Sequence, residues 1–349
     1  MMGLGYTLTL VMVGTFLLGV LGGLLGSILV LRRQALMGDA LSHATLPGVM
    51  LTFLWFGTRS LDGLLLGAAL SAGVAYLLMN VIKKQSFFHW DATMALLLAG
   101  FFGFGQWVLS IIQRQGSAAQ AGLSRFIFGQ AATMLRADVE RMVLVSVVLI
   151  IVLMVVLKEI KMYVFDEAFF ASLGYKSRPM DVLLGLMTLI FIILGIRMVG
   201  VVLISALLIA PALIARQWTQ RFHNMLVLAA LSGGFSGAIG TYLSATAANI
   251  PTGPVIVFVL GVVFMVSFLF APKEGLLVRS IESMKVKRMI QKYQTLIHLY
   301  EQQDLVEKTP QMAHYEASGW VYYDQALWRL TDQGEAKVKA LKRVILDEH

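Results

Sequence analysis

Long runs of apolar residues, separated by short polar connections, extend over the first 271 residues of the chain. Several runs are about 18–25 residues long, which is enough for a helix to cross a bilayer. The pattern predicts an all-α polytopic membrane protein: a bundle of nine transmembrane helices, with eight or ten as alternatives. The first run is too long and too rich in glycine for a typical signal peptide, so we retain it as a helix. The expected spans lie near residues 7–31, 35–56, 61–82, 91–112, 138–157, 180–196, 199–215, 224–247 and 252–271.

Lysine and arginine are distributed unevenly over the connections between these spans. One alternate set of connections holds twelve of them: Arg32, Arg33, Lys83, Lys84, Lys158, Lys161, Lys176, Arg178, Arg216, Arg221, Lys273 and Arg279. The other set holds five: Arg59, Arg114, Arg125, Arg136 and Arg197. Because positively charged loops stay in the cytoplasm, we expect the N-terminus outside and the C-terminus inside.

Composition agrees with this class and narrows the chemistry. The chain is 58% hydrophobic and 14% charged, with a mean hydropathy of +0.77. The net charge of +8 belongs to the membrane loops, because residues 1–271 hold 16 Lys/Arg against 9 Asp/Glu, whereas residues 272–349 hold 12 against 11. There is no cysteine, which excludes disulfides, thiolate metal sites and a cysteine nucleophile.

Glycines recur within the spans, notably Gly19, Gly23 and Gly233. Small residues at four-residue spacing allow helix backbones to approach closely in lipid, so they predict a compact bundle. The longest outer connection, residues 113–137, contains Phe126 to Gln130, which fits either an interfacial or a re-entrant helix.

Asp39 and His43 lie four residues apart inside an apolar segment, a spacing that places both side chains on one face of a helix. A carboxylate at a bilayer centre costs about 2.5–3.5 kcal/mol, so Asp39 is not expected to face lipid. Carboxylate and imidazole donors suit divalent Mn, Fe or Zn. Pro47 follows His43 by one turn and is expected to loosen the helix beside the pair. If Arg33 marks the inner interface, Asp39 lies only about 9 Å into the membrane, nearer an inner gate than the midplane.

The cytoplasmic segment from Asp166 to Lys176 has the signals of a short amphipathic helix. Asp166 is expected to cap it, Glu167 to favour its first turn, and Gly174 to end it. Its apolar residues, Phe169, Phe170 and Leu173 among them, could insert into a partner. One interpretation is an ordinary capped connector. The other is a coupling helix that docks into a groove of a cytoplasmic ATPase.

Two proline positions resemble the hinges of transporters. Pro211 interrupts an expected span, and Pro251 belongs to a proline–glycine turn at an outer helix boundary. Broken helices and fixed turns are parts that transporters use to change conformation. We therefore interpret Pro47, Pro211 and Pro251 as hinge or packing positions.

In this order, these features resemble the integral-membrane permease family of bacterial manganese/zinc/iron ABC importers. The resemblance covers about residues 10–271, and its specific parts are Met37 to Gly48, Asp166 to Gly174, Val201 to Ala215, and Ile250 to Pro254. It implies a core of two permease copies (a homo- or heterodimer), a separate cytoplasmic ATPase, and an extracytoplasmic metal-binding protein that delivers the ion.

The resemblance also implies that Asp39 and His43 line the ion path, with each subunit supplying one pair across the dimer axis. The metal would be the transported cargo and not a permanently bound cofactor. The expected location is the bacterial cytoplasmic (inner) membrane. The family often has an acidic residue where this chain has Asn249, which argues against a ligand role for that position.

The chain contains no Walker-type phosphate-binding motif, so we expect no enzyme activity in this subunit and ATP hydrolysis by a partner. Two alternative functions remain open at this point. One is an ABC permease for a metal chelate such as a siderophore, and the other is a proton-coupled secondary metal transporter with Asp39 and His43 as a proton relay.

From residue 273 onward the composition becomes that of a soluble domain, which divides the chain into a permease domain, 1–272, and a cytoplasmic domain, 273–349. We predict a helix from Arg279 to Glu301, a hairpin from Trp320 to Leu330, and a helix capped by Thr331. The stretch from Leu330 to Ala336 is similar to the stretch after the wing of small winged-helix domains, so this domain is expected to be α+β.

Charge argues against nucleic-acid binding by this domain. Residues 293–349 hold 6 Lys/Arg and 9 Asp/Glu, where phosphate binding requires a basic face. We therefore favour a docking or regulatory role. His298, His314 and His349 are too scattered for a metal site.

Overall fold

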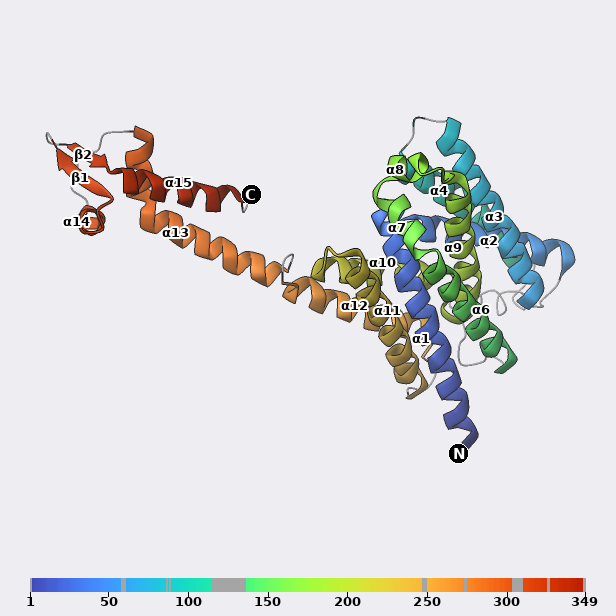
Figure 1. Cartoon of the computed structure of the whole chain (residues 1–349). Helices are drawn as coiled ribbons and strands as arrows, with labels where there is room; N and C mark the ends of the chain where they lie inside the picture. The colour runs from blue at the N-terminus through green and yellow to red at the C-terminus, as the bar shows by residue number, and fades with distance from the viewer. Residues whose placement is uncertain are drawn as a thin grey trace. The chain divides into compact units, whose positions relative to one another are not determined.

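The computed structural model describes residues 2–57, 61–85, 87, 89–114, 136–246, 250–272, 275–302, 310–324 and 327–347. The chain forms two compact units, Met1–Pro272 and Lys273–His349. Figure 1 follows the elements of both along the chain. The first unit is helical, and the second combines helices with a two-stranded hairpin.

The first unit is a bundle in which each expected span lies largely within one helix. Its helices are α1 (Met2–Leu31), α2 (Met37–Phe56), α3 (Leu61–Gln85), α4 (Trp90–Arg114), α6 (Arg136–Val155), α7 (Leu157–Phe165), α8 (Glu167–Ser172), α9 (Ser177–Val199), α10 (Val201–Trp218), α11 (Phe222–Thr246) and α12 (Thr252–Phe270). The prediction of an all-α polytopic membrane protein is confirmed.

Length and composition of the helices support fewer membrane spans than the nine expected. Among the described residues, six helices are long and apolar enough to cross a membrane: α1, α3, α4, α9, α11 and α12. The pair α6 and α7 would add a seventh if it is one span bent by 62°. The remaining expected spans, α2 and α10, are not in this set, because α2 carries Asp39 and His43 and the apolar part of α10 is short. The total of nine stays a prediction.

Residues 158–165 were expected to be part of a polar connection, but they form the helix α7. Val156 separates α6 from α7 with φ −96° and ψ 13°. No proline or glycine marks this break in the sequence, so neither the break nor the continuing helix could be read from local signals.

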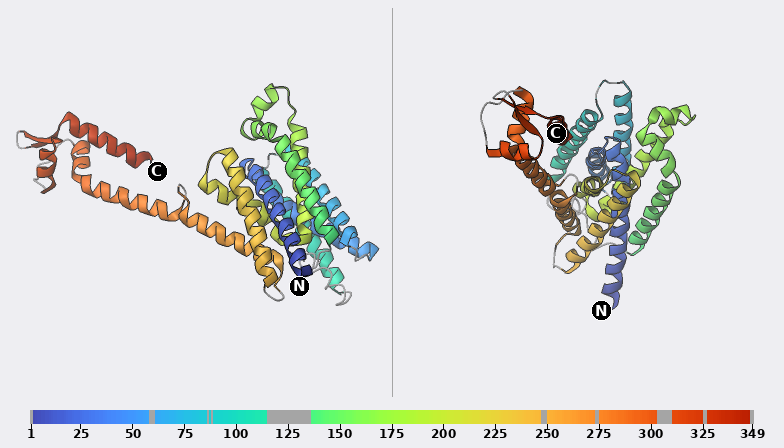
Figure 2. Two further views of the ribbon diagram at one scale, coloured as in Figure 1. Left: turned by 60° about the horizontal axis from the view of Figure 1, so that its bottom comes forward. Right: turned by 60° about the vertical axis from the view of Figure 1, so that its left-hand side comes forward.

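Helix α1 packs along α11 (Figure 2), and glycines make the approach possible. A Cβ atom on Gly19 would overlap the backbone carbonyl of Gly233, and one on Gly23 would overlap the carbonyl of Ala229. On the α10 side, a Cβ atom on Gly26 would meet the carbonyl of Leu208. The backbones are therefore in direct contact, as small-residue packing in lipid requires.

The second unit contains α13 (Leu276–Gln302), α14 (Pro310–Ala317), β1 (Val321–Asp324), β2 (Leu327–Leu330) and α15 (Asp332–Asp347). The strands are antiparallel, with Val321 opposite Leu330. Thr331 caps α15, since its Oγ1 accepts a hydrogen bond from the backbone N–H of Gly334 at 3.1 Å. The apolar core of this unit includes Leu296, Leu299, Met312, Tyr315, Val321, Trp328 and Val338. Its assignment as a winged-helix domain stays a prediction.

Candidate functional site

Asp39 and His43 lie one turn apart near the start of α2. The Oδ1 atom of Asp39 is 3.4 Å from Nε2 of His43, the proximity that an i,i+4 spacing produces on a helix. Asp39 occupies the first turn of α2, where unpaired backbone N–H groups favour a negative charge. The side chain of His43 is 18% exposed and that of Asp39 is 30% exposed, so the pair faces a partly open surface.

Two other helices contribute side chains to the surroundings of this pair. The ring of Phe102, on α4, lies edge-to-face against His43, with centroids 4.9 Å apart and planes at 79°. Ser205, on α10, is within hydrogen-bonding reach of the Asp39 carboxylate. Sequence reasoning assigned no role to either residue, because both lie on helices distant from α2 along the chain.

The pair alone is a small ligand set. Over the parts of the chain that the structure describes, no group of three or more His, Asp or Glu side chains is placed to hold a metal ion. A divalent transition metal takes four or more ligands. Water or another polypeptide would have to complete a coordination shell built on Asp39 and His43.

The segment after α7 forms the short helix α8, with the cap that the sequence indicates. Oδ1 of Asp166 accepts a hydrogen bond from the backbone N–H of Phe169 at 2.8 Å. Glu167 is in the first turn. Beyond the helix, Gly174 has φ +87°, a left-handed conformation that glycine adopts without strain and that ends the segment.

The apolar side chains of α8 divide between the interior and the surface. Phe170 is 1% exposed and packs into the bundle, whereas Phe169 and Leu173 are each 51% exposed. The flanking Phe165 and Tyr175 are also exposed. We refer to the four exposed residues, Phe165, Phe169, Leu173 and Tyr175, as the α8 surface. These residues lie in α8 or within two residues of its capping positions, Asp166 and Leu173.

The three prolines named as hinge or packing positions lie inside helices or at a helix start. Pro47 and Pro211 are buried within α2 and α10. Each removes one backbone N–H from its helix, which leaves a carbonyl without its usual partner. Pro251 immediately precedes α12, and there the hydroxyl of Ser244 donates to the carbonyl of Ile250 at 2.8 Å. Their role as hinges stays a prediction.

Several positions named from the sequence lie outside the described residues: Phe126 to Gln130, Asn249 and His349. Of the remaining tail histidines, His298 lies on α13 and His314 on α14. His314 packs against Tyr315 and Trp320, with ring centroids 6.2 and 6.4 Å apart.

Comparison with known proteins identifies relatives of the first unit. The family model described as "ABC 3 transport family" matches residues 5–271. The chain is 40% identical over 292 residues to the manganese transport system membrane protein MntC of Bacillus subtilis, covering 84% of this chain and 67% of that protein. It is 44% identical over 272 residues to the zinc transport system membrane protein TroC of Treponema pallidum, covering 78% of this chain and 91% of that protein.

Solved structures show the same fold. PsaBC from Streptococcus pneumoniae, determined in complex with a Fab, superposes with a TM-score of 0.65 at 25% identity, covering 77% of this chain and 93% of that one. An ABC transporter assigned to the metal-chelate type, in an inward-facing conformation, has a TM-score of 0.54 at 18% identity, covering 73% and 84%.

Proposed function

The chain belongs to the ABC 3 transport family, and from this membership we infer that it is the permease subunit of a bacterial ABC importer for a divalent transition-metal ion. Relatives at 40% and 44% identity are named as manganese and zinc transport proteins. Its apolar helices and its membrane-protein relatives support a multi-pass protein of the bacterial inner membrane. Membership in an ABC family also supports an ATPase, and not a proton gradient, as the proposed energy source.

The proposed ion site is the Asp39–His43 pair, and its geometry is the observation that carries the proposal. With metal–ligand bonds of about 2.0–2.2 Å, two ligands of one tetrahedral ion lie roughly 3.3–3.6 Å apart. The 3.4 Å between Oδ1 and Nε2 matches that separation. A metal ion could therefore bind between the two atoms with little movement of either side chain.

A second copy of the chain would supply the missing ligands. Two-fold symmetry brings the same surface of each copy to one axis, so two Asp–His pairs would give four protein ligands. In this mechanism an extracytoplasmic binding protein delivers the ion, both pairs hold it, and a conformational change exposes it to the cytoplasm. Manganese, zinc and iron all accept this donor set, so the uptake experiment described below has to identify which metal is transported.

The energy for that change would come from a cytoplasmic ATPase docked on the α8 surface. Its exposed aromatic and aliphatic side chains are those that a short helix inserts into a groove of a partner. Asp166 caps the N-terminus of α8, and the buried side chain of Phe170 packs it against the bundle. For the second unit, which lies beyond the family match, we propose a docking or regulatory role, in agreement with the excess of Asp and Glu over Lys and Arg in residues 293–349.

The test is uptake of radioactive Mn, Zn and Fe into proteoliposomes that contain the permease, its ATPase and its binding protein. The native chain is compared with Asp39→Ala and His43→Ala. The matched controls are Asp91→Ala and His223→Ala, which remove the same side chains from exposed positions at the starts of α4 and α11.

We expect both site variants to abolish uptake of one metal while the complex still assembles, and both controls to transport at the native rate. Uptake that survives both site substitutions would show that the pair is structural. Equal loss in all four variants would show a general effect on the bundle and would also remove the pair as the ion site.

A further inference from the structure

Two aromatic side chains connect the region of α8 to the bundle: Phe165 contacts Phe222 of α11 at 5.7 Å between ring centroids, and Phe170 is buried. Phe170 stacks on Tyr175 with ring centroids 4.9 Å apart and planes at 18°. On its other side it contacts Tyr163 of α7, at 5.2 Å between centroids. A force applied to α8 by a docked partner therefore reaches the ring of Tyr163.

The hydroxyl of Tyr163 belongs to a polar network of three residues, which we call the Arg32–Tyr163–Asp181 network. Tyr163 donates to Oδ1 of Asp181 at 2.7 Å and accepts from Nη2 of Arg32 at 3.0 Å. Arg32 and Asp181 also form an ion pair at 2.6 Å. The guanidinium carbon of Arg32 lies 4.6 Å from the centre of the Tyr163 ring. Each residue of the network thus contacts both others.

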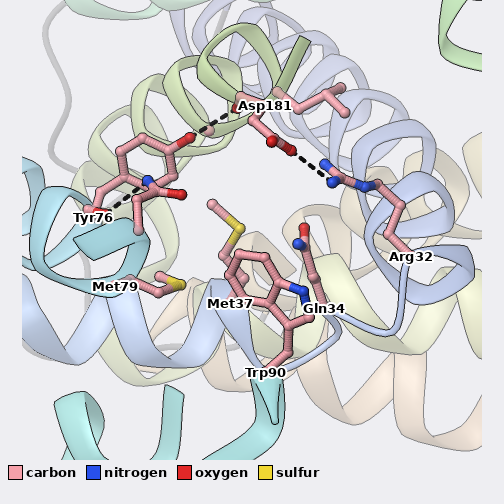
Figure 3. Close-up of a pocket in the computed structure, with 10 residues that line it drawn as sticks. Arg32, Gln34, Met37, Tyr76, Met79, Trp90 and Asp181 are labelled. Carbon is pink, nitrogen blue, oxygen red and sulfur yellow. Dashed lines mark hydrogen bonds and ion pairs between the residues drawn. The ribbon is translucent and has the colours of Figure 1, made fainter. Parts of the chain in front are cut away.

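The network joins helices that are far apart in sequence. Arg32 follows the last residue of α1, Tyr163 lies on α7, and Asp181 lies in the first turns of α9. Figure 3 shows Arg32 and Asp181 on one side of a small cavity, with Tyr76 of α3 across from them. The cavity has about 10 Å³ of room for the centre of a water molecule, so it holds at most about one water.

A rigid turn connects Arg32 to the helix that carries the proposed ion site. Arg33 has φ +57°, and backbone bonds close the end of α1, from the N–H of Gln34 to the carbonyl of Leu29 at 2.8 Å. The N–H of Met37 then donates to the carbonyl of Gln34 at 3.0 Å and starts α2. Gln34 is 3% exposed. Asp39 is two residues further along, so a hydrogen-bonded backbone turn connects Arg32 to the start of the proposed ion site.

We propose that the Arg32–Tyr163–Asp181 network transmits movement of α8 to the start of α2, and so couples ATP hydrolysis in the partner to ion release at Asp39 and His43. The inference rests on the proposed function. Arg32, Tyr163 and Asp181 are positioning residues here, because they act on the ion site through other residues. Their removal should uncouple hydrolysis from transport without preventing either partner from binding.

The decisive variant is Tyr163→Phe. It keeps the ring that packs on Phe170 and lies under Arg32, and it removes only the hydroxyl. Tyr76→Phe is the matched control, because the Tyr76 hydroxyl donates to the backbone carbonyl of Asp181 at 2.8 Å from α3, a helix that carries neither Phe170 nor Tyr163. Asp181→Asn is a second test variant that removes the charge and keeps the shape.

The assay measures metal uptake and ATP hydrolysis in the same proteoliposomes, with the complete complex, and expresses the result as ions transported per ATP. We expect this ratio to fall about tenfold in Tyr163→Phe, the factor for about 1.4 kcal/mol, which is close to the lower end of the range for a hydrogen bond to a charged group. Asp181→Asn should show a similar fall. Tyr76→Phe should keep the native ratio.

An unchanged ratio of ions per ATP in Tyr163→Phe would overturn the proposal. Equal reductions in Tyr163→Phe and Tyr76→Phe would also overturn it, because a purely structural role predicts similar effects for both hydroxyls. The amount of assembled complex is measured for each variant, and the ratio does not depend on it. Asp39→Ala is included in the same experiment. Normal uptake by Asp39→Ala would contradict the proposed ion site, whereas a changed ratio in Tyr163→Phe would still support coupling through the network.

Discussion

Removal of the α8 cap tests whether this helix is the docking element. Asp166 is exposed, and its carboxylate makes one hydrogen bond, to the backbone N–H of Phe169 at 2.8 Å. Asp166→Ala would leave that N–H without its partner and would leave the bundle core unchanged. Replacement of such a cap by alanine destabilises a helix by about 1 kcal/mol.

The size of the effect follows from the length of the helix. With six residues, α8 is far below the length at which an isolated helix is stable in water. Its population therefore depends on the cap and on the anchor of Phe170. A loss of about 1 kcal/mol lowers the helical population, and with it the apparent affinity for the ATPase, by up to about fivefold.

The assay is the binding affinity of the purified ATPase for the permease in nanodiscs. Asp166→Asn is the matched control, because asparagine caps a helix as well as aspartate does. We expect weaker binding with Asp166→Ala and near-native binding with Asp166→Asn. Equal weakening in both variants would show that the charge matters and not the cap. Native affinity in Asp166→Ala would refute the assignment of α8 as the docking element.

Two further predictions concern the packing of the bundle and the second unit. Gly23→Leu should lower the melting temperature in detergent, because its side chain would meet the carbonyl of Ala229, whereas Gly103→Leu, with nothing within 4 Å of its added Cβ, should not. In the second unit, Lys342 donates to Oε1 of Glu301 at 2.9 Å and its charge adds to the effect, which holds the pKa of Glu301 below the ordinary 4.5. The interaction therefore stabilises the second unit at pH values above the ordinary pKa of 4.5. This stabilisation is lost as the pH falls through the lower pKa that Glu301 has in the folded unit. Limited proteolysis of the full chain should show this loss, and Glu301→Gln should remove that pH dependence.

Local signals in the sequence predicted much of the architecture. The caps at Asp166 and Thr331 are in the expected places, because a side chain that bonds a nearby backbone N–H acts within three residues. The hairpin between Trp320 and Leu330 follows from alternation of apolar and polar residues. The glycines that were predicted to allow close helix packing, Gly19, Gly23 and Gly233, lie at direct backbone contacts between helices.

Features that depend on contacts between distant helices could not be predicted. The Arg32–Tyr163–Asp181 network joins residues separated by up to 149 positions. In the sequence, Arg32 indicated only a cytoplasmic loop, because the positive-inside rule uses charge and not partners. The sequence likewise gives no sign that Phe102 lies against His43. The break at Val156 has no proline or glycine, so no local signal in the sequence predicts it.

The glycine contacts between α1, α10 and α11 restrict how this bundle can move. Because backbone touches backbone at Gly19, Gly23 and Gly26, a slide of one residue, about 1.5 Å along the axis, would bring larger side chains against carbonyl groups. The contacts therefore oppose translation along α1. These three helices form a closely packed frame within the subunit, and the start of α2 packs directly against it, because a Cβ atom on Gly38 would meet the side chain of Leu208 on α10.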